Sequence, residues 1–92
     1  MRVRWTPDAA SDLEGIHAYL SVEHPELVQS TVLFVYREIK ALARFPMMGR
    51  EAVRPGFREL YLAPLPYLCT YRVEEDAVVI LRIHHTAQNR VV

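Results

Sequence analysis

Residues 57–85 read FRELYLAPLPYLCTYRVEEDAVVILRIHH, and this stretch decides the fold class. Apolar and polar residues alternate in three parts of it, and a period of two is typical of β-strands with one buried face. The three expected strands are Phe57–Ala63, Tyr67–Val73 and Ala77–His85. Pro64, Pro66 and the acidic run 74–76 separate them as turns. Consecutive strands joined by short turns predict a mostly antiparallel sheet.

Two amphipathic helices are expected before these strands. Thr6-Pro7-Asp8 starts the first, because Thr is a good N-cap, Pro fits the first turn and Asp favours the positive end of the helix dipole. Apolar residues recur at helical spacing over residues 9–20 and again over residues 28–42. The first helix is expected to end within Ser21–His24, and Pro25 opens the second. So short a break predicts an antiparallel helical hairpin.

A short strand at Arg2–Trp5 and a loop at Pro46–Gly56, which holds two prolines and two glycines, complete the expected order. That order is β-α-α-β-β-β, an α+β fold in which a helical hairpin packs on one face of a small, mostly antiparallel sheet. We expect residues 1–92 to form a single domain, because a chain of this length suits one compact domain and not two.

The alternation assigns the strand residues to two faces of the sheet. The face toward the helices is expected to carry Leu60, Leu62, Tyr67, Cys69, Tyr71, Val73, Val79, Leu81 and Ile83. The opposite face is expected to carry Glu59, Tyr61, Thr70, Arg72, Ile80, Arg82 and His84. On the core face, the lone Cys69 is expected to be a buried, unreactive thiol.

The outward-facing polar residues allow two interpretations. In a metal-independent endoribonuclease, Glu59 or His84 would transfer protons, while Arg72 and Arg82 would hold phosphate. Alternatively they form cross-strand ion pairs and ordinary exposed side chains, and alternation alone favours this interpretation. The adjacent His84 and His85 point to opposite faces of a strand and lack a third ligand, so we expect no metal and no cofactor.

Charge is balanced overall but unevenly distributed. The 11 basic and 11 acidic residues cancel, whereas a nucleic-acid-binding domain is usually more basic. Residues 37–58 nevertheless carry six basic residues (Arg37, Lys40, Arg44, Arg50, Arg54 and Arg58) against Glu38 and Glu51. Solvated cations at a helix C-terminus explain this excess, and a patch that faces phosphate or a partner is the alternative.

The location of the protein can also be predicted. No apolar run approaches the length of a membrane span, and no signal peptide follows the first residues. A single cysteine fits a reducing compartment. We therefore expect a cytoplasmic protein with no membrane partner.

Several local motifs recur in a fixed order along nearly the whole chain. They are Trp5-Thr6-Pro7 with Ala9, Asp12 and Leu13; Phe45-Pro46 with Gly49-Arg50; Gly56–Leu60; Tyr67 with Tyr71-Arg72-Val73; and Ile80–His84 with Ala87-Gln88. In these motifs the chain resembles the RelE/ParE superfamily of type II toxin–antitoxin toxins, nearer its ParE-like plasmid-stabilisation branch. The resemblance implies the fold described above, inhibition of cell growth, and neutralisation by a cognate antitoxin in a hetero-oligomer.

The resemblance also implies alternative targets. ParE-like members inhibit DNA gyrase and are not nucleases, whereas RelE-like members cut mRNA in the ribosomal A site. The zero net charge and the lack of any aromatic residue after Tyr71 favour gyrase and no catalytic residue. The alternatives are a ribosome-dependent mRNA endonuclease using Glu59, Arg72, Arg82 and His84, or a non-toxic relic that binds only an antitoxin. Residues expected to contact target or antitoxin are Arg50, Arg54, Arg58, Tyr61, Arg72, Arg82, His84, Gln88 and Arg90.

Overall fold

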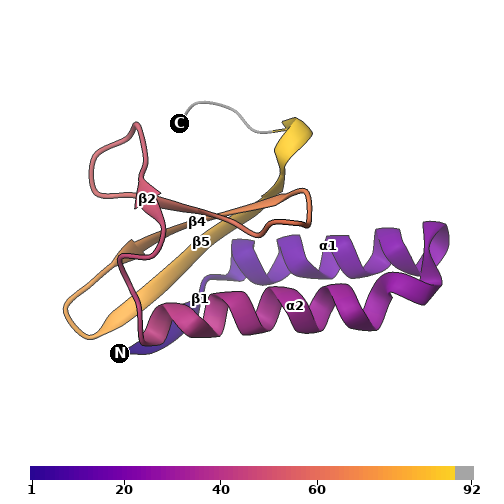
Figure 1. Ribbon diagram of the computed structural model, residues 1–92, viewed down its shortest axis with the longest axis horizontal. Helices are drawn as coiled ribbons and strands as arrows, with labels where there is room; N and C mark the ends of the chain where they lie inside the picture. The colour runs from indigo at the N-terminus through magenta and orange to yellow at the C-terminus, as the bar shows by residue number, and fades with distance from the viewer. Residues whose placement is uncertain (89–92) are drawn as a thin grey trace.

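A computed structural model describes residues 1–88 and has two layers, a five-stranded sheet and a helical hairpin on one of its faces (Figure 1). The strand order is β1-β5-β4-β3-β2, with β1 parallel to β5 and every other neighbouring pair antiparallel. The strands are β1 (Arg2–Trp5), β2 (Arg50–Glu51), β3 (Arg58–Tyr61), β4 (Tyr67–Val73) and β5 (Ala77–His85). The predicted α+β fold, with a hairpin on a mostly antiparallel sheet, is confirmed.

The helices follow the predicted start and stop signals. The hydroxyl of Thr6 caps α1 by accepting a hydrogen bond from the N–H of Ala9 at 3.1 Å. Pro25 begins the short turn between the helices, as its missing N–H and fixed φ require. Among residues 1–88, no helix is both long enough and apolar enough to span a bilayer. The helices are α1 (Pro7–Glu23), η1 (Pro25–Leu27), α2 (Val28–Lys40), η2 (Ala41–Ala43) and η3 (Thr86–Gln88).

The predicted loop at Pro46–Gly56 contains one short strand. In β2, Arg50 pairs with Glu59 and Glu51 pairs with Arg58. Two residues are too few to show a period of two, so the alternation that reveals longer strands is missing here. The strand places Arg50 at the edge of the sheet beside β3.

The core lies between the hairpin and one face of the sheet. The buried residues in contact there are Ala9, Leu13, Val35, Ile39, Leu42, Leu60, Leu62, Tyr67, Cys69, Tyr71, Val78, Ile80 and Ile83. The predicted core residues Leu60, Leu62, Tyr67, Cys69 and Tyr71 are confirmed, and Val73 is partly buried against the same cluster. Two of the three predicted for β5, Val79 and Leu81, are not in this cluster.

The predicted faces of β5 were wrong because this strand contains an extra residue. Thr70 of β4 pairs with Arg82, but the next residue, Tyr71, pairs with Ile80, so Leu81 has no partner. An inserted residue reverses the alternation on one side of the bulge. Ile80, predicted to face outward, is therefore fully buried in the core, and Leu81, predicted to be buried there, is partly exposed.

The same bulge exchanges two residues nearer the start of β5. Val78 joins the core cluster, whereas Val79, predicted to face the helices, lies between Arg4 and Arg72 in the register of the neighbouring strands. Val79 is still buried. The prediction therefore placed Val78 and Val79 on the wrong faces of the sheet, although both are buried apolar residues.

Substitutions at β5 test this assignment. Ile39→Ala and Ile80→Ala are expected to lower the free energy of unfolding by about 2–5 kcal/mol each, because both side chains are buried in the core. Leu81→Ala is expected to cost less than about 1 kcal/mol, because its side chain is partly exposed. Urea denaturation followed by circular dichroism measures all three. A larger loss at Leu81 than at Ile80 would contradict the bulge.

Candidate functional site

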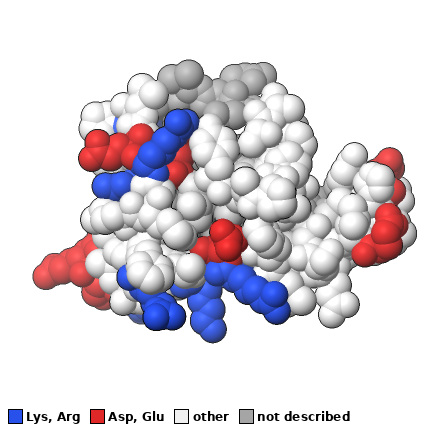
Figure 2. Space-filling view, viewed as in Figure 1, with Lys and Arg blue, Asp and Glu red and all other residues white. Residues whose placement is uncertain are grey.

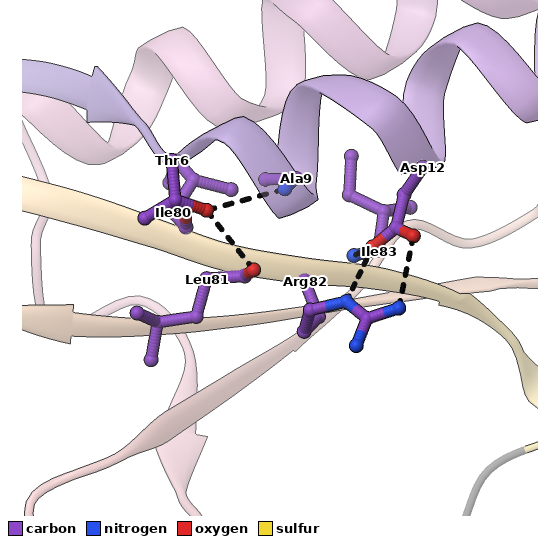
Figure 3. A network of polar contacts seen from close by, with 7 residues as sticks. All are labelled: Thr6, Ala9, Asp12, Ile80, Leu81, Arg82 and Ile83. Atoms are coloured by element: carbon purple, nitrogen blue, oxygen red, sulfur yellow. Dashed lines mark hydrogen bonds and ion pairs between the residues drawn. The ribbon is translucent and has the colours of Figure 1, made fainter.

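The first turns of α1 cover the edge of β5 beyond the end of β1 (Figure 3). The hydroxyl oxygen of Thr6 lies 2.8 Å from the carbonyl oxygen of Ile80 and 3.1 Å from that of Leu81. Asp12 accepts a hydrogen bond from the backbone N–H of Ile83 at 2.8 Å. The Thr6 hydroxyl at the N-cap and the Asp12 carboxylate of α1 thus bind backbone groups of β5 at and beyond the point where its pairing with β1 ends.

Arg82 is bound to α1, although its side chain stays 47% exposed. Its Nε and Nη2 donate to the two carboxylate oxygens of Asp12 at 2.8 and 3.1 Å (Figure 3). Burial alone would raise the pKa of Asp12, but hydrogen bonds from Arg82 and from the N–H of Ile83 lower it below its usual value. The hydrogen bond to Asp12 in turn raises the pKa of Arg82. The planar guanidinium is therefore already paired with a carboxylate.

Removing Asp12 is expected to weaken the contact between α1 and β5. Asp12→Ala should lower the free energy of unfolding by about 1.5–3 kcal/mol, the range for hydrogen bonds to a charged group. Asp12→Asn should cost less, because its amide oxygen can still accept from the N–H of Ile83. Thermal or urea unfolding at pH 7 measures both.

The pH dependence of the same contact supplies a second measurement. Because the native pKa of Asp12 is lowered, its charge stabilises the fold above about pH 4, its ordinary pKa, and this stabilisation is lost as the pH falls through the native pKa. The stability deficit of Asp12→Asn should therefore shrink between pH 5 and about pH 2.5. An equal deficit at both pH values would contradict the role of the charged pair.

The hydroxyl of Tyr71 holds the turn that follows α2. It donates to the carbonyl of Pro46 at 2.8 Å and accepts from the N–H of Gly49 at 2.9 Å. A Cβ at Gly49 would lie 2.6 Å from that hydroxyl and 2.8 Å from the carbonyl oxygen of Glu59, so a side chain does not fit. Burial raises the pKa of Tyr71, and the hydroxyl stays protonated and able to donate. The sequence predicts this segment only as part of the loop Pro46–Gly56.

Two substitutions test the clamp that the Tyr71 hydroxyl forms with Pro46 and Gly49. Tyr71→Phe is expected to lower the free energy of unfolding by about 1–3 kcal/mol, because two buried backbone groups lose their partner. Gly49→Ala is expected to cost at least as much through overlap, and the two costs should be less than additive because they share one contact. Gly15→Ala is the matched control: open space surrounds Gly15, and Ala in a helix should stabilise by about 0.5–1 kcal/mol. Additive costs at Tyr71 and Gly49 would contradict the clamp.

The clamped turn leads into a polar cluster at the edge of the sheet. Nη2 of Arg50 lies 3.4 Å from Oε1 of Glu59 and 3.1 Å from the hydroxyl of Tyr61. Its guanidinium also lies 5.1 Å from the centre of the Tyr61 ring, within range of a cation–π interaction. The Glu59 side chain is only 12% exposed, whereas Tyr61 is 43% exposed. The accessible part of this cluster is therefore an arginine stacked on a phenol.

The cross-strand register brings several predicted site residues onto the face of the sheet that points away from the helices. They form the rows Glu59–Thr70–Arg82 and Tyr61–Leu68–His84. Glu59 and Arg82 are two strands apart, and each pairs with a different residue of opposite charge. Arg72 donates from Nε to Glu74 at 2.8 Å. The predicted group shares one face but does not converge on a common point.

The other predicted contact residues lie elsewhere. Arg58 donates to the carbonyl of Gly49 at 2.7 Å, and the guanidinium of Arg54 lies 4.8 Å from the centre of the Phe57 ring. Both arginines therefore make contacts within the segment that carries β2. The backbone of Gln88 belongs to η3, and Arg90 lies outside the described residues.

The structure offers little for metal or thiol chemistry within residues 1–88. No group of three or more His, Cys, Asp or Glu side chains in this part of the chain could hold a metal ion. Burial raises the pKa of Cys69 to about 12, so the thiol stays protonated near neutral pH.

Comparison with known proteins identifies the family of this chain. The family described as "ParE toxin of type II toxin-antitoxin system, parDE" matches residues 3–90. "Putative toxin Y4kP" of Sinorhizobium fredii is 37% identical over 95% of this chain and 90% of its own length, and "Toxin RelE2" of Caulobacter vibrioides is 36% identical over 95% and 97%. The chain belongs to the ParE toxin family, and the resemblance seen in its sequence motifs is confirmed.

Solved structures agree with this assignment. A chain from the "Chromosomal ParDE TA system from P. aeruginosa" is 32% identical with a TM-score of 0.80, covering 92% of this chain and 95% of its own. A chain from the toxin–antitoxin complex RelBE2 of Mycobacterium tuberculosis is 26% identical with a TM-score of 0.61, covering 91% and 95%. The protein is thus a toxin of a type II toxin–antitoxin system, a class that works with an antitoxin protein.

Proposed function

We propose that this toxin arrests growth by binding DNA gyrase, and that it does not cut mRNA. One observation carries the proposal: the ionised residues that could have formed a ribonuclease site are each paired within the protein. Asp12 neutralises Arg82, Glu74 neutralises Arg72, and Arg50 neutralises Glu59.

Phosphodiester cleavage requires free cations where charge develops and a free base within reach of the attacking hydroxyl. The side chain of Arg82 is 47% exposed, but its Nε and Nη2 already donate to a carboxylate that is 16% exposed, so a phosphate would compete with Asp12 for its charge. The carboxylate of Glu59 is 12% exposed and lies beside the Arg50 guanidinium, which shields it from a substrate. This arrangement favours a binding surface over a catalytic one.

A binding surface needs a few partly exposed anchors, and the outer face of the sheet provides them. Arg and Tyr are the residue types most enriched among residues that dominate binding energy. Arg50 and Tyr61 are stacked and accessible at the sheet edge, and the half-buried His84 lies in the same row as Tyr61. We therefore assign target contact to Arg50, Tyr61 and His84, in the cytoplasm where gyrase acts.

The antitoxin is assigned to a different surface, the apolar groove of the helical hairpin. A hollow of about 640 Å³ there is lined by Trp5, Leu13, His17, Val32 and Tyr36, among others. The rings of Trp5 and Tyr36, both part of the lining, lie with their centres 5.5 Å apart and their planes tilted by 49°. A groove of this kind suits an amphipathic segment that folds on binding.

Cleavage of ribosome-bound mRNA is the second candidate. It is favoured by the common face of Glu59, Arg82 and His84 and by the similarity to a protein named toxin RelE2. A toxin fold that has lost toxicity and binds only its antitoxin is the third. The three candidates differ in measurable activities.

Induced expression, gyrase supercoiling and primer extension on cellular mRNA separate them. We expect growth arrest, impaired supercoiling and uncut mRNA.

Tyr61→Ser should weaken gyrase inhibition roughly tenfold or more, as for a binding anchor. His84→Gln should retain much of the toxicity, because it keeps a hydrogen-bonding group that cannot shuttle protons. His24→Gln, at an exposed histidine that follows α1 and lies outside both proposed surfaces, is the matched control. Codon-positioned cleavage that His84→Gln abolishes would establish the ribonuclease instead, and no growth arrest at all would indicate the relic.

A further inference from the structure

Two arginines at the edge of the sheet lie over aromatic rings. The guanidinium of Arg50 lies 5.1 Å from the centre of the Tyr61 ring, and that of Arg54 lies 4.8 Å from the centre of the Phe57 ring. Both arginines are exposed. A guanidinium that stacks by its face keeps N–H groups along its edge, where a carboxylate can accept two of them. Each stack is therefore able to bind one carboxylate of another molecule.

The loop between β2 and β3 holds the second stack in place. The N–H of Ala52 donates to the carbonyl of Phe57 at 2.9 Å, which extends the pairing of β2 with β3 by one residue. The N–H of Phe57 donates to the carbonyl of Arg54 at 3.3 Å, and Gly56 has a φ of 86°. Pro at the second position and a positive φ at Gly in the third are typical of a type II turn. The turn fixes the backbone on both sides of the stack before any partner arrives, which lowers the entropic cost of binding.

Both guanidiniums keep donors for another molecule. Among the contacts within residues 1–88, Arg50 donates only from Nη2, to Glu59 and Tyr61. In the same part of the chain, the guanidinium of Arg54 forms no hydrogen bond and no ion pair, whereas Arg82 gives two donors to Asp12. Figure 2 shows basic and acidic side chains together on the surface near β2 and its loop, at the upper left of the view. The positive charge at this edge is therefore available to an acidic partner.

The carboxylate of Glu59 separates the two stacks. Alternation puts Phe57, Glu59 and Tyr61 on one face of the sheet, with the two rings four residues apart, or about 13 Å at the rise of a strand. A second carboxylate directly opposite Glu59 would be repelled. Two acidic groups of a partner would thus lie about 13 Å apart, one at each arginine. We call Arg50, Arg54, Phe57, Glu59 and Tyr61 the arginine edge.

We propose that an extended acidic segment of gyrase binds the arginine edge, with one carboxylate on Arg50 and another on Arg54. This inference rests on the proposed inhibition of gyrase. In an extended segment every second side chain faces the same way, so the two carboxylates belong to residues i and i+4, and residue i+2, which faces Glu59, is not acidic.

The charge of the protein favours a protein segment over a nucleic acid at this edge. Nucleic acids present continuous phosphates, and the domains that bind them are usually basic. This chain has a net charge of zero, and Glu59 lies between the two arginines. Two separated carboxylates match this alternation of charge, and an unbroken row of phosphates does not.

The test measures the affinity of the full chain for gyrase holoenzyme by surface plasmon resonance at several salt concentrations. Arg54→Gln is expected to weaken binding about threefold to tenfold and to reduce its salt dependence, because one ion pair across the interface is lost. Arg54→Lys keeps the charge but not the planar fork, so it should restore only part of the affinity. Arg44→Gln is the matched control and should stay within about twofold. Arg44 is likewise exposed and lies 5.6 Å from the centre of an aromatic ring, that of Phe45, but outside the arginine edge.

A double variant tests whether the two stacks bind separate carboxylates. Arg54→Gln and Tyr61→Ser change stacks about 13 Å apart, so their losses of affinity should multiply to within about twofold. A double variant that binds no more weakly than the weaker single variant would mean that both stacks hold one shared group, and it would overturn the spacing.

The outcomes separate this inference from the proposed function. If the wild-type toxin inhibits gyrase and Arg54→Gln binds it as tightly as wild type, gyrase is the target and the two-point contact is wrong. If the wild-type toxin neither binds nor inhibits gyrase, the proposed function is wrong as well. If Arg54→Gln weakens binding to duplex DNA alone and not to gyrase free of DNA, the arginine edge contacts nucleic acid and the inference is overturned. Circular dichroism melting of each variant ensures that a folded protein is compared.

Discussion

The carboxylate of Asp12 joins the two layers of this protein. One oxygen accepts both from the backbone of Ile83 and from Nε of Arg82, and the other accepts from Nη2 of Arg82. Together with the Thr6 hydroxyl, it completes the edge of β5 where β1 has ended and the bulge at Leu81 disturbs the pairing with β4. The contact of the hairpin with β5 and the pairing of Arg82 therefore both depend on one partly buried ion pair.

The helices and most of the sheet could be predicted because their signals are local. The cap at Thr6, the break at Pro25 and the periodicity between them lie within a few residues of the structure they determine. The bulge could not be predicted, because residues 77–81 are all apolar. Without alternating polar residues, the sequence does not indicate which side chains face the core. The missed strand β2 is likewise too short to show a period.

The site could be predicted only as a set of residues on one face. The register between β3, β4 and β5 confirms that Glu59, Arg82 and His84 share that face. Their partners could not be deduced, since Asp12 is 70 residues from Arg82 along the chain and Tyr71 is 22 residues from Gly49. Such pairings depend on tertiary structure, and they decide which cations are neutralised and which remain available to another molecule.

The parallel pairing of β1 with β5 has a consequence for the order in which the molecule can fold during synthesis. Arg2 pairs with Ala77 and Trp5 with Ile80, so the first strand made waits for the last one before it has a neighbour in the sheet. The hairpin is complete much earlier, yet the surface that it buries against β5 does not exist until the C-terminal strand leaves the ribosome tunnel. The apolar side of the hairpin therefore stays open until translation is almost finished, and the complete two-layer fold forms only at the end of synthesis.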